Sequence, residues 1–164
     1  MIFVTVGTHP GQFERLIRKI DELAPKINEE IIVQRGSTKY IPKNCKSFTF
    51  TSNIDNYFKK ARLAINHAGA SAILEYAFKY EKPLIIVPRQ KKYGEHIDNH
   101  QVEFGEYFSE KTGALLIKDI KTLTPEILNS YRKKVKISKS NLNKFKKYFK
   151  LFIEHEKSIR KKQN

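Results

Sequence analysis

The stretch from Leu63 to Glu75 holds the residue types best suited to chemistry. A short apolar run, Leu63-Ala64-Ile65, is typical of a buried strand. Small residues follow at Ala68-Gly69-Ala70-Ser71, and apolar residues then recur at helical spacing. The pattern predicts a strand, a tight turn and a helix. The first turn of such a helix presents unpaired N–H groups and a positive dipole end, which suit a phosphate.

Three polar side chains frame this predicted anion site. Ser71 can cap the helix or donate its hydroxyl to the phosphate. Glu75 lies four residues later on the same helical face, where its carboxylate suits the paired hydroxyls of a ribose. His67 stands at the strand tip and is the candidate catalytic residue. An ordinary strand-to-helix turn with a glycine at its corner explains the spacing equally well.

The run His67-Ala68-Gly69-Ala70-Ser71, followed by Leu74-Glu75, resembles the nucleotide-sugar motif of GT-B glycosyltransferases, in the C-terminal-domain type of family 28. The likeness covers roughly residues 1–130. The chain looks closer to the one-domain catalytic subunits of two-component transferases than to the C-terminal domain of the two-domain bacterial members. These one-domain subunits act on dolichyl-linked GlcNAc or in bacterial exopolysaccharide synthesis. The resemblance implies that Gly69, Ala70, Ser71 and Glu75 bind the donor substrate.

A second glycine loop lies near the N-terminus. Residues 1–6 form an apolar run that predicts a buried strand, residues 7–11 are loop-like, and apolar residues from Phe13 to Leu23 predict a helix. The loop lacks the GxGxxG pattern of dinucleotide sites. In the resembling family it lies beside the donor phosphates, which adds Gly7 and Thr8 as binding residues. We interpret His9 as a loop histidine more readily than as a chemical group.

The segment His96-Ile-Asp98-Asn99-His100-Gln101 resembles the sugar-recognition loop of the same family. The resemblance implies that Asp98, Asn99 and Gln101 contact the donor sugar. From the residues alone, Asp98 is a good N-cap for the helix that follows, and both roles can hold together.

Metal binding is the alternative interpretation of this segment. His96 and His100 would share one face of a helix if both were helical. No cysteine is nearby, and the only close carboxylates, Glu95 and Asp98, look exposed. We therefore expect no metal ion here, which agrees with the metal-independent catalysis that the resemblance implies.

The rest of the chain alternates between strand and helix patterns. Further strands are predicted at residues 30–34, 47–51, 83–88 and 115–117. Helices are predicted near 53–61, over Val102 to Phe108, and from a start at Thr124. This alternation predicts an α/β fold, a Rossmann-like, doubly wound, mostly parallel sheet that forms the donor-binding half of a GT-B fold. Phe50 and Ile54 fit either the core or, less readily, the flank of a uracil.

Composition places these elements in one domain. The chain has 164 residues, one cysteine, and no apolar run long enough to span a bilayer. The start of the chain lacks the basic segment of a signal peptide. These features predict a cytoplasmic protein. Its net charge of +15 is concentrated in residues 130–164, which hold 13 Lys and Arg against two Glu.

The sequence predicts two parts, a UDP-sugar-binding domain at 1–130 and a basic helical extension at 131–164. Apolar residues recur along the extension at helical spacing, at Leu142, Phe145, Phe149 and Phe152. This seam could pack on its own domain, bind a groove of a partner, or rest on an acidic membrane surface.

The resemblance implies the donor-binding catalytic subunit of a two-component transferase. Such a subunit moves a sugar, GlcNAc as the first choice, from a UDP-sugar to a lipid-linked acceptor and needs no cofactor. A membrane-anchored, acceptor-binding partner would supply the general base. The same partner would recruit the catalytic subunit to the cytoplasmic face of the membrane. A nucleic-acid-binding module would leave the α/β core unexplained, and sugar-nucleotide epimerases carry both GT-B domains in one chain. We expect no nucleic-acid partner.

Overall fold

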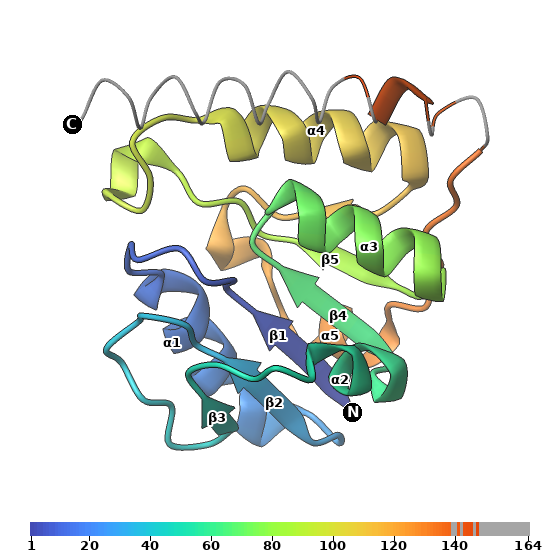
Figure 1. Ribbon diagram of the computed structural model, residues 1–164. Helices are drawn as coiled ribbons and strands as arrows, with labels where there is room; N and C mark the ends of the chain where they lie inside the picture. The colour runs from blue at the N-terminus through green and yellow to red at the C-terminus, as the bar shows by residue number, and fades with distance from the viewer. Residues whose placement is uncertain (139–140, 142, 146, 148–164) are drawn as a thin grey trace.

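The computed structural model describes residues 1–138, 141, 143–145 and 147, without the side chain of Ser71. Its centre is a six-stranded, fully parallel sheet (Figure 1). The spatial order of the strands is β3-β2-β1-β4-β5-β6. Their bounds are β1 Ile2–Thr5, β2 Ile31–Gln34, β3 Lys46–Phe48, β4 Leu63–Asn66, β5 Leu84–Ile86 and β6 Leu115–Leu116.

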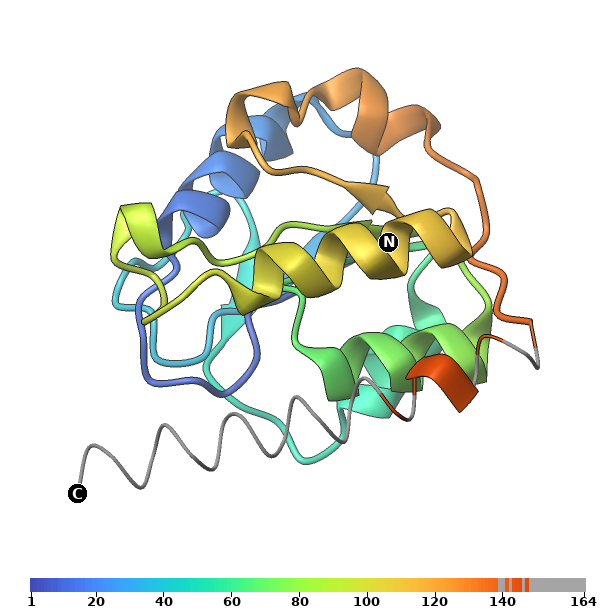
Figure 2. The same ribbon diagram turned by 90° about the horizontal axis from the view of Figure 1, so that it is seen from above.

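Helices cover both faces of this sheet. The α-helices are α1 Glu14–Leu23, α2 Ile54–Lys60, α3 Ala70–Tyr80, α4 His100–Thr112 and α5 Pro125–Ser130. Short 3₁₀ turns are η1 Ala24–Lys26, η2 Lys91–Tyr93 and η3 Ile120–Thr122. Figure 2 shows α1 and α5 on one side of the sheet and α2 and α3 on the other. Each side has its own apolar core, so the predicted doubly wound fold is confirmed.

Local signals explain where several elements begin. The Asn53 side chain accepts the N–H of Asn56 at the start of α2. The Thr124 hydroxyl accepts the N–H of Ile127 at the start of α5, as predicted. The strand predicted at 47–51 was placed too late, because β3 ends at Phe48. As a result Phe50 is 67% exposed, and its predicted core role is wrong.

The order of the strands fixes where a ligand crevice forms. Chain connections run outward in opposite directions from the centre, so β1 and β4 flank the point where the winding reverses. At such a point the loops after the two strands part and leave a crevice beyond their carboxyl ends. The two glycine loops found in the sequence follow these two strands.

The described part of the segment after residue 130 is attached to this domain. Val135 is fully buried, and Phe145 packs its ring against Phe108 with a centroid separation of 5.3 Å. Phe145, at least, therefore covers its own domain. The remaining seam residues Leu142, Phe149 and Phe152 lie outside the described residues, as do residues 139–140, 146 and 148–164 of the predicted helical extension. Within the described residues, no helix combines the length and apolar character needed to cross a bilayer.

Candidate functional site

A pocket of about 350 Å³ opens at the carboxyl edge of the sheet, between the two glycine loops. The loop after β1 contributes Gly7, Thr8 and His9, and the turn after β4 contributes His67 and Gly69. The remaining lining residues are Thr5, Pro10, Gln34, Ile54 and Ala72. The structure therefore brings together four predicted site residues that are about 60 positions apart in the sequence: Gly7, Thr8, His67 and Gly69.

His67 is held between the two glycine loops. A Cβ added at Gly7 would lie 2.4 Å from Cε1 of His67, and one added at Gly69 would lie 2.4 Å from its Nε2. Only glycine permits these approaches. Burial, with a smaller contribution from the charge of Arg89, lowers the pKa of His67 to about 3. The ring is therefore neutral at physiological pH and fixes the spacing between the loops.

This depressed pKa predicts a pH-dependent stability. In the unfolded chain His67 titrates near 6.5, whereas the folded chain resists its protonation. The unfolded state therefore binds more protons below pH 6.5, and stability falls as the pH drops. From pH 6.5 to about 4.5, His67 is expected to remove at most about 1.4 kcal/mol per pH unit. Urea unfolding across this range should show a shallower slope for His67→Gln, and equal slopes would contradict the assignment.

The turn after β4 explains the start of α3. Ala68 is buried and has a φ of +63°, a conformation that costs energy for any residue with a side chain. This bend turns the chain so that Gly69 is the N-cap and Ala70 the first helical residue. Ser71 follows in the first turn, and its side chain lies outside the described atoms. Glu75 is exposed, one turn beyond the pocket-lining Ala72.

Sequence reasoning missed a row of polar residues beneath the pocket. Thr5, Gln34 and Asn66 end three adjacent strands in register, and all three are buried. The Thr5 hydroxyl donates to Gln34 Oε1 at 2.9 Å. Among the described residues, neither polar side-chain atom of Asn66 has a hydrogen-bond partner. A polar residue closing an otherwise apolar strand was the signal available in the sequence.

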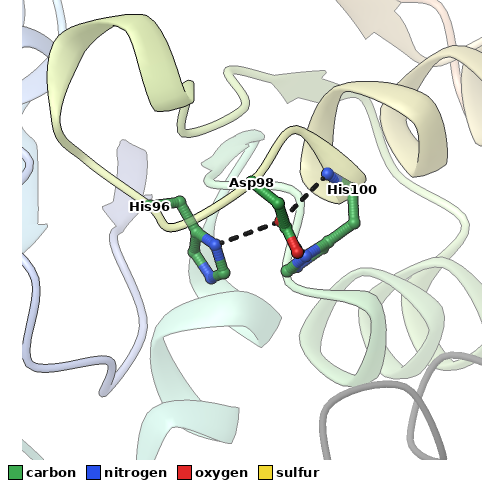
Figure 3. A group of neighbouring side chains, drawn as sticks. All are labelled: His96, Asp98 and His100. Carbon is green, nitrogen blue, oxygen red and sulfur yellow. Dashed lines mark hydrogen bonds and ion pairs between the residues drawn. The ribbon is translucent and has the colours of Figure 1, made fainter. Parts of the chain in front are cut away.

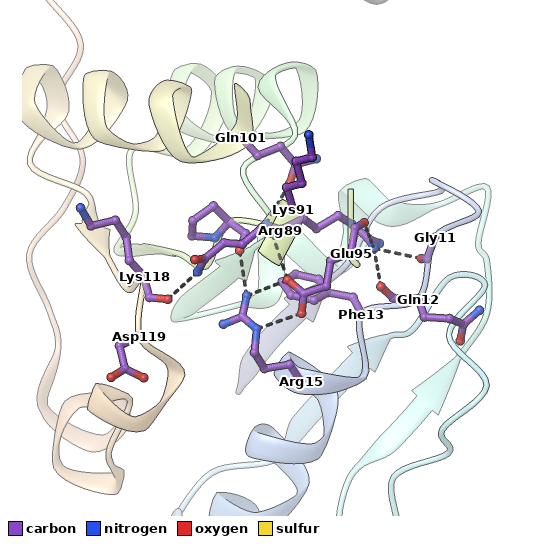
Figure 4. Close-up of polar contacts among 12 residues, drawn as sticks. Gly11, Gln12, Phe13, Arg15, Arg89, Lys91, Glu95, Gln101, Lys118 and Asp119 are labelled. Atoms are coloured by element: carbon purple, nitrogen blue, oxygen red, sulfur yellow. Dashed lines mark hydrogen bonds and ion pairs between the residues drawn. The ribbon is translucent and has the colours of Figure 1, made fainter. Parts of the chain in front are cut away.

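Arg89, which directly follows the strand predicted at residues 83–88, was not among the predicted site residues. Arg89 is fully buried, and its guanidinium donates to the backbone carbonyls of Gly11 and Gln12, both at 2.9 Å (Figure 4). It also donates to the carbonyl of Val6 at 3.0 Å. The guanidinium carbon of Arg89 lies over the Phe13 ring, 4.8 Å from the ring centroid. Burial lowers the pKa of Arg89 to about 10, so the group stays charged at neutral pH. Arg89 thus ties the loop after β5 to the glycine loop after β1.

Glu95 completes this network. The prediction that Glu95 is exposed was wrong: it is 5% exposed and forms a two-pronged ion pair with Arg15, at 2.8 and 2.9 Å. Its Oε2 also accepts the N–H of Gln90. The carboxylate pairs with Arg15, whereas Arg89 contacts the backbone carbonyl of Glu95 at 3.5 Å. The charge of Arg89 is therefore not neutralised by a direct ion pair with Glu95. A pairing across 80 residues has no local signal, so the sequence could not reveal it.

The predicted sugar-contact residues lie at the start of α4, and their described bonds are internal. Gln101 is buried and its Oε1 accepts the N–H of Arg89. Asn99 Oδ1 accepts the N–H of Lys91. The N-cap is Asn99, not Asp98 as predicted; Asp98 instead accepts the N–H of His100. Their roles toward a sugar stay a prediction.

The same segment gathers the side chains of His96, Asp98 and His100, which point toward one another (Figure 3). His96 lies before the helix, so the two histidines do not share a helical face. The His9 ring stacks on His96 with a centroid separation of 4.9 Å, which connects this cluster to the lining of the pocket.

Fold and site together define a Rossmann-like domain with a crevice at its switch point. Residues 1–162 match the family model of the glycosyltransferase family 28 C-terminal domain, and the chain belongs to this family. The resemblance seen in residues 67–75 is therefore confirmed.

Two relatives of this chain are, by their names, UDP-N-acetylglucosamine-dependent transferases or subunits of one. The human UDP-N-acetylglucosamine transferase subunit ALG13 is 32% identical over 139 residues, covering 75% of this chain and 11% of the relative. The UDP-N-acetylglucosamine–N-acetylmuramyl-(pentapeptide) pyrophosphoryl-undecaprenol N-acetylglucosamine transferase of Trichodesmium erythraeum is 31% identical over 136 residues, covering 79% and 35%. The chain thus spans well under half of these relatives.

A solved structure agrees with the fold. The glycosyltransferase of kitacinnamycin superposes with a TM-score of 0.57 at 20% identity, covering 79% of this chain and 33% of that one. At this identity the likeness concerns the fold alone.

Proposed function

We propose that this chain binds a UDP-sugar, UDP-GlcNAc as the first choice, as the donor-binding catalytic part of a two-component glycosyltransferase. The observation that carries the proposal is the pocket itself, which both glycine loops of a family 28 domain border at the switch point. The named sugar of the ALG13 and bacterial relatives supports GlcNAc.

The leaving diphosphate would lie against Gly69 and the first turn of α3. There the unpaired N–H groups and the helix dipole stabilise negative charge without a metal ion. The glycine loop with Gly7 and Thr8 would contact the opposite side of the diphosphate. Buried Arg89 fixes three carbonyls in and around that loop and adds positive charge nearby. Binding groups held in place beforehand stabilise developing charge most effectively.

A general base must also deprotonate the acceptor hydroxyl. A pKa of about 3 makes neutral His67 a weak base near pH 7, so its proposed contribution is to position the loops. We infer that a membrane-anchored, acceptor-binding partner supplies the base and a lipid-linked acceptor at the cytoplasmic face of the membrane. The name of the human relative, a transferase subunit, supports a two-component arrangement.

Glu75→Ala tests the donor site. Loss of its hydrogen bonds to the ribose is expected to weaken UDP binding by about 1–3 kcal/mol, the range for bonds to a charged group. Isothermal titration calorimetry with UDP measures the change. Glu110→Ala removes a carboxylate that is also exposed, near the far end of α4, and should leave the affinity unchanged. Equal affinities in both folded variants would remove Glu75 from the site; absence of UDP binding by the unmodified chain would overturn the proposal.

A further inference from the structure

The cluster of His96, Asp98 and His100 collects three metal-ligand side chains within five residues. One ligand atom from each lies within 4.8 Å of the others. His96 Nδ1 is 3.3 Å from Asp98 Oδ1, and His100 Nδ1 contacts the same oxygen. The two imidazole rings meet edge to face, with centroids 4.4 Å apart. Figure 3 shows all three groups converging from the loop before α4 and from its first residue.

The surrounding structure holds this cluster in place. Asp98 accepts the backbone N–H of His100 and so bends the chain into the first turn of α4. On the other side, Glu95 is anchored by Arg15 and by the N–H of Gln90. Donor atoms that are already gathered lose little entropy when an ion binds, which favours affinity.

Contrary to the expectation from the sequence, we propose that His96, Asp98 and His100 bind a divalent transition-metal ion, zinc above all, at the start of α4. Two imidazole nitrogens and one carboxylate oxygen suit zinc, whereas magnesium and calcium prefer oxygen ligands. Ligand atoms about 2.0–2.1 Å from a tetrahedral zinc ion lie roughly 3.4 Å apart. The His96–Asp98 spacing of 3.3 Å matches this value, whereas the His100–Asp98 contact is shorter and would widen around a bound ion.

Two further observations support the site. His96 has a side-chain exposure of 4%, and within the described part of the chain its Nδ1 has no hydrogen bond that ion binding would have to break. Asp98 retains 29% exposure, which gives an ion a path from solvent. Asp98 Oδ1 accepts the N–H of His100, and a carboxylate oxygen has a second lone pair with which it can bind an ion. Three protein ligands leave a fourth position for water.

Cobalt(II) is the most direct probe, because tetrahedral coordination gives it intense visible absorption. The metal-free chain is expected to bind one cobalt ion with this spectrum and to bind zinc competitively. Asp98→Asn should weaken zinc binding by more than the roughly 10- to 100-fold that a lost outer-shell contact costs. Glu103→Gln is the matched control, an exposed carboxylate in the first turn of α4.

Melting curves of the metal-free variants will establish that they are folded. No tetrahedral cobalt spectrum, or equal zinc affinity in Asp98→Asn and Glu103→Gln, would overturn the proposal. Loss of binding in a folded His96→Gln variant would support it. The titration uses no nucleotide, so its outcome is independent of the proposed donor function.

Discussion

Replacing Arg89 with methionine is expected to lower the free energy of unfolding by about 3 kcal/mol or more. The substitution leaves the carbonyls of Val6, Gly11 and Gln12 without their donor, and each unsatisfied buried group costs about 1–3 kcal/mol. Urea unfolding followed by circular dichroism measures the loss. If the variant folds, its UDP affinity should also fall, because the glycine loop loses its anchor.

Arg18→Met is the matched control for this experiment. Arg18 lies on the surface of α1 and pairs with Glu14 at 59% side-chain exposure. Exposed ion pairs contribute about 0–1 kcal/mol, so the control should change little. Similar losses for both variants would show that the buried guanidinium does not hold the loops together.

Replacing Gly7 with alanine is expected to cost about 2–4 kcal/mol of stability. Gly7 has a φ of +71°, which is unfavourable for alanine, and the new Cβ would lie 2.4 Å from the His67 ring. Thermal and urea unfolding measure the loss. Because the displaced ring also separates the glycine loops, UDP binding should weaken in the same variant.

Gly94→Ala separates the two causes. Gly94 has a similar φ of +66° but no atom within 4 Å of an added Cβ, so only the backbone cost of about 1–2 kcal/mol is expected. In a double-mutant cycle, His67→Ala should recover part of the loss caused by Gly7→Ala. Equal costs at Gly7 and Gly94 would mean that the His67 contact carries no energy.

The predicted alternation of strands and helices is confirmed over the described chain because it depends on local patterns. Parallel strands covered on both faces need continuous apolar runs such as residues 63–65, and α1 needs apolar residues at helical spacing. The glycine loops after β1 and β4 were located from the sequence for the same reason. Their meeting at one crevice follows once both strands are parallel and adjacent.

Two errors show where local patterns end. Period-two alternation at residues 47–51 separates the faces of a strand, but it cannot say that pairing stops at Phe48. Phe50 therefore lies on the surface. Glu95 and Arg89 look like loop residues because charged side chains are usually solvated. Their burial depends on Arg15 and on carbonyls more than 70 residues away.

The sequence by itself determined the α/β class, the two strand–glycine–helix units and the family resemblance, because each depends on residues close together in the chain. Only the tertiary structure decided how the site is held. The spacing of Gly7, His67 and Gly69, the buried Arg89 network and the convergence of His96 with Asp98 and His100 all depend on atomic distances. Such distances are set by packing between segments far apart in the sequence and by the exact path of loops, which residue patterns do not encode.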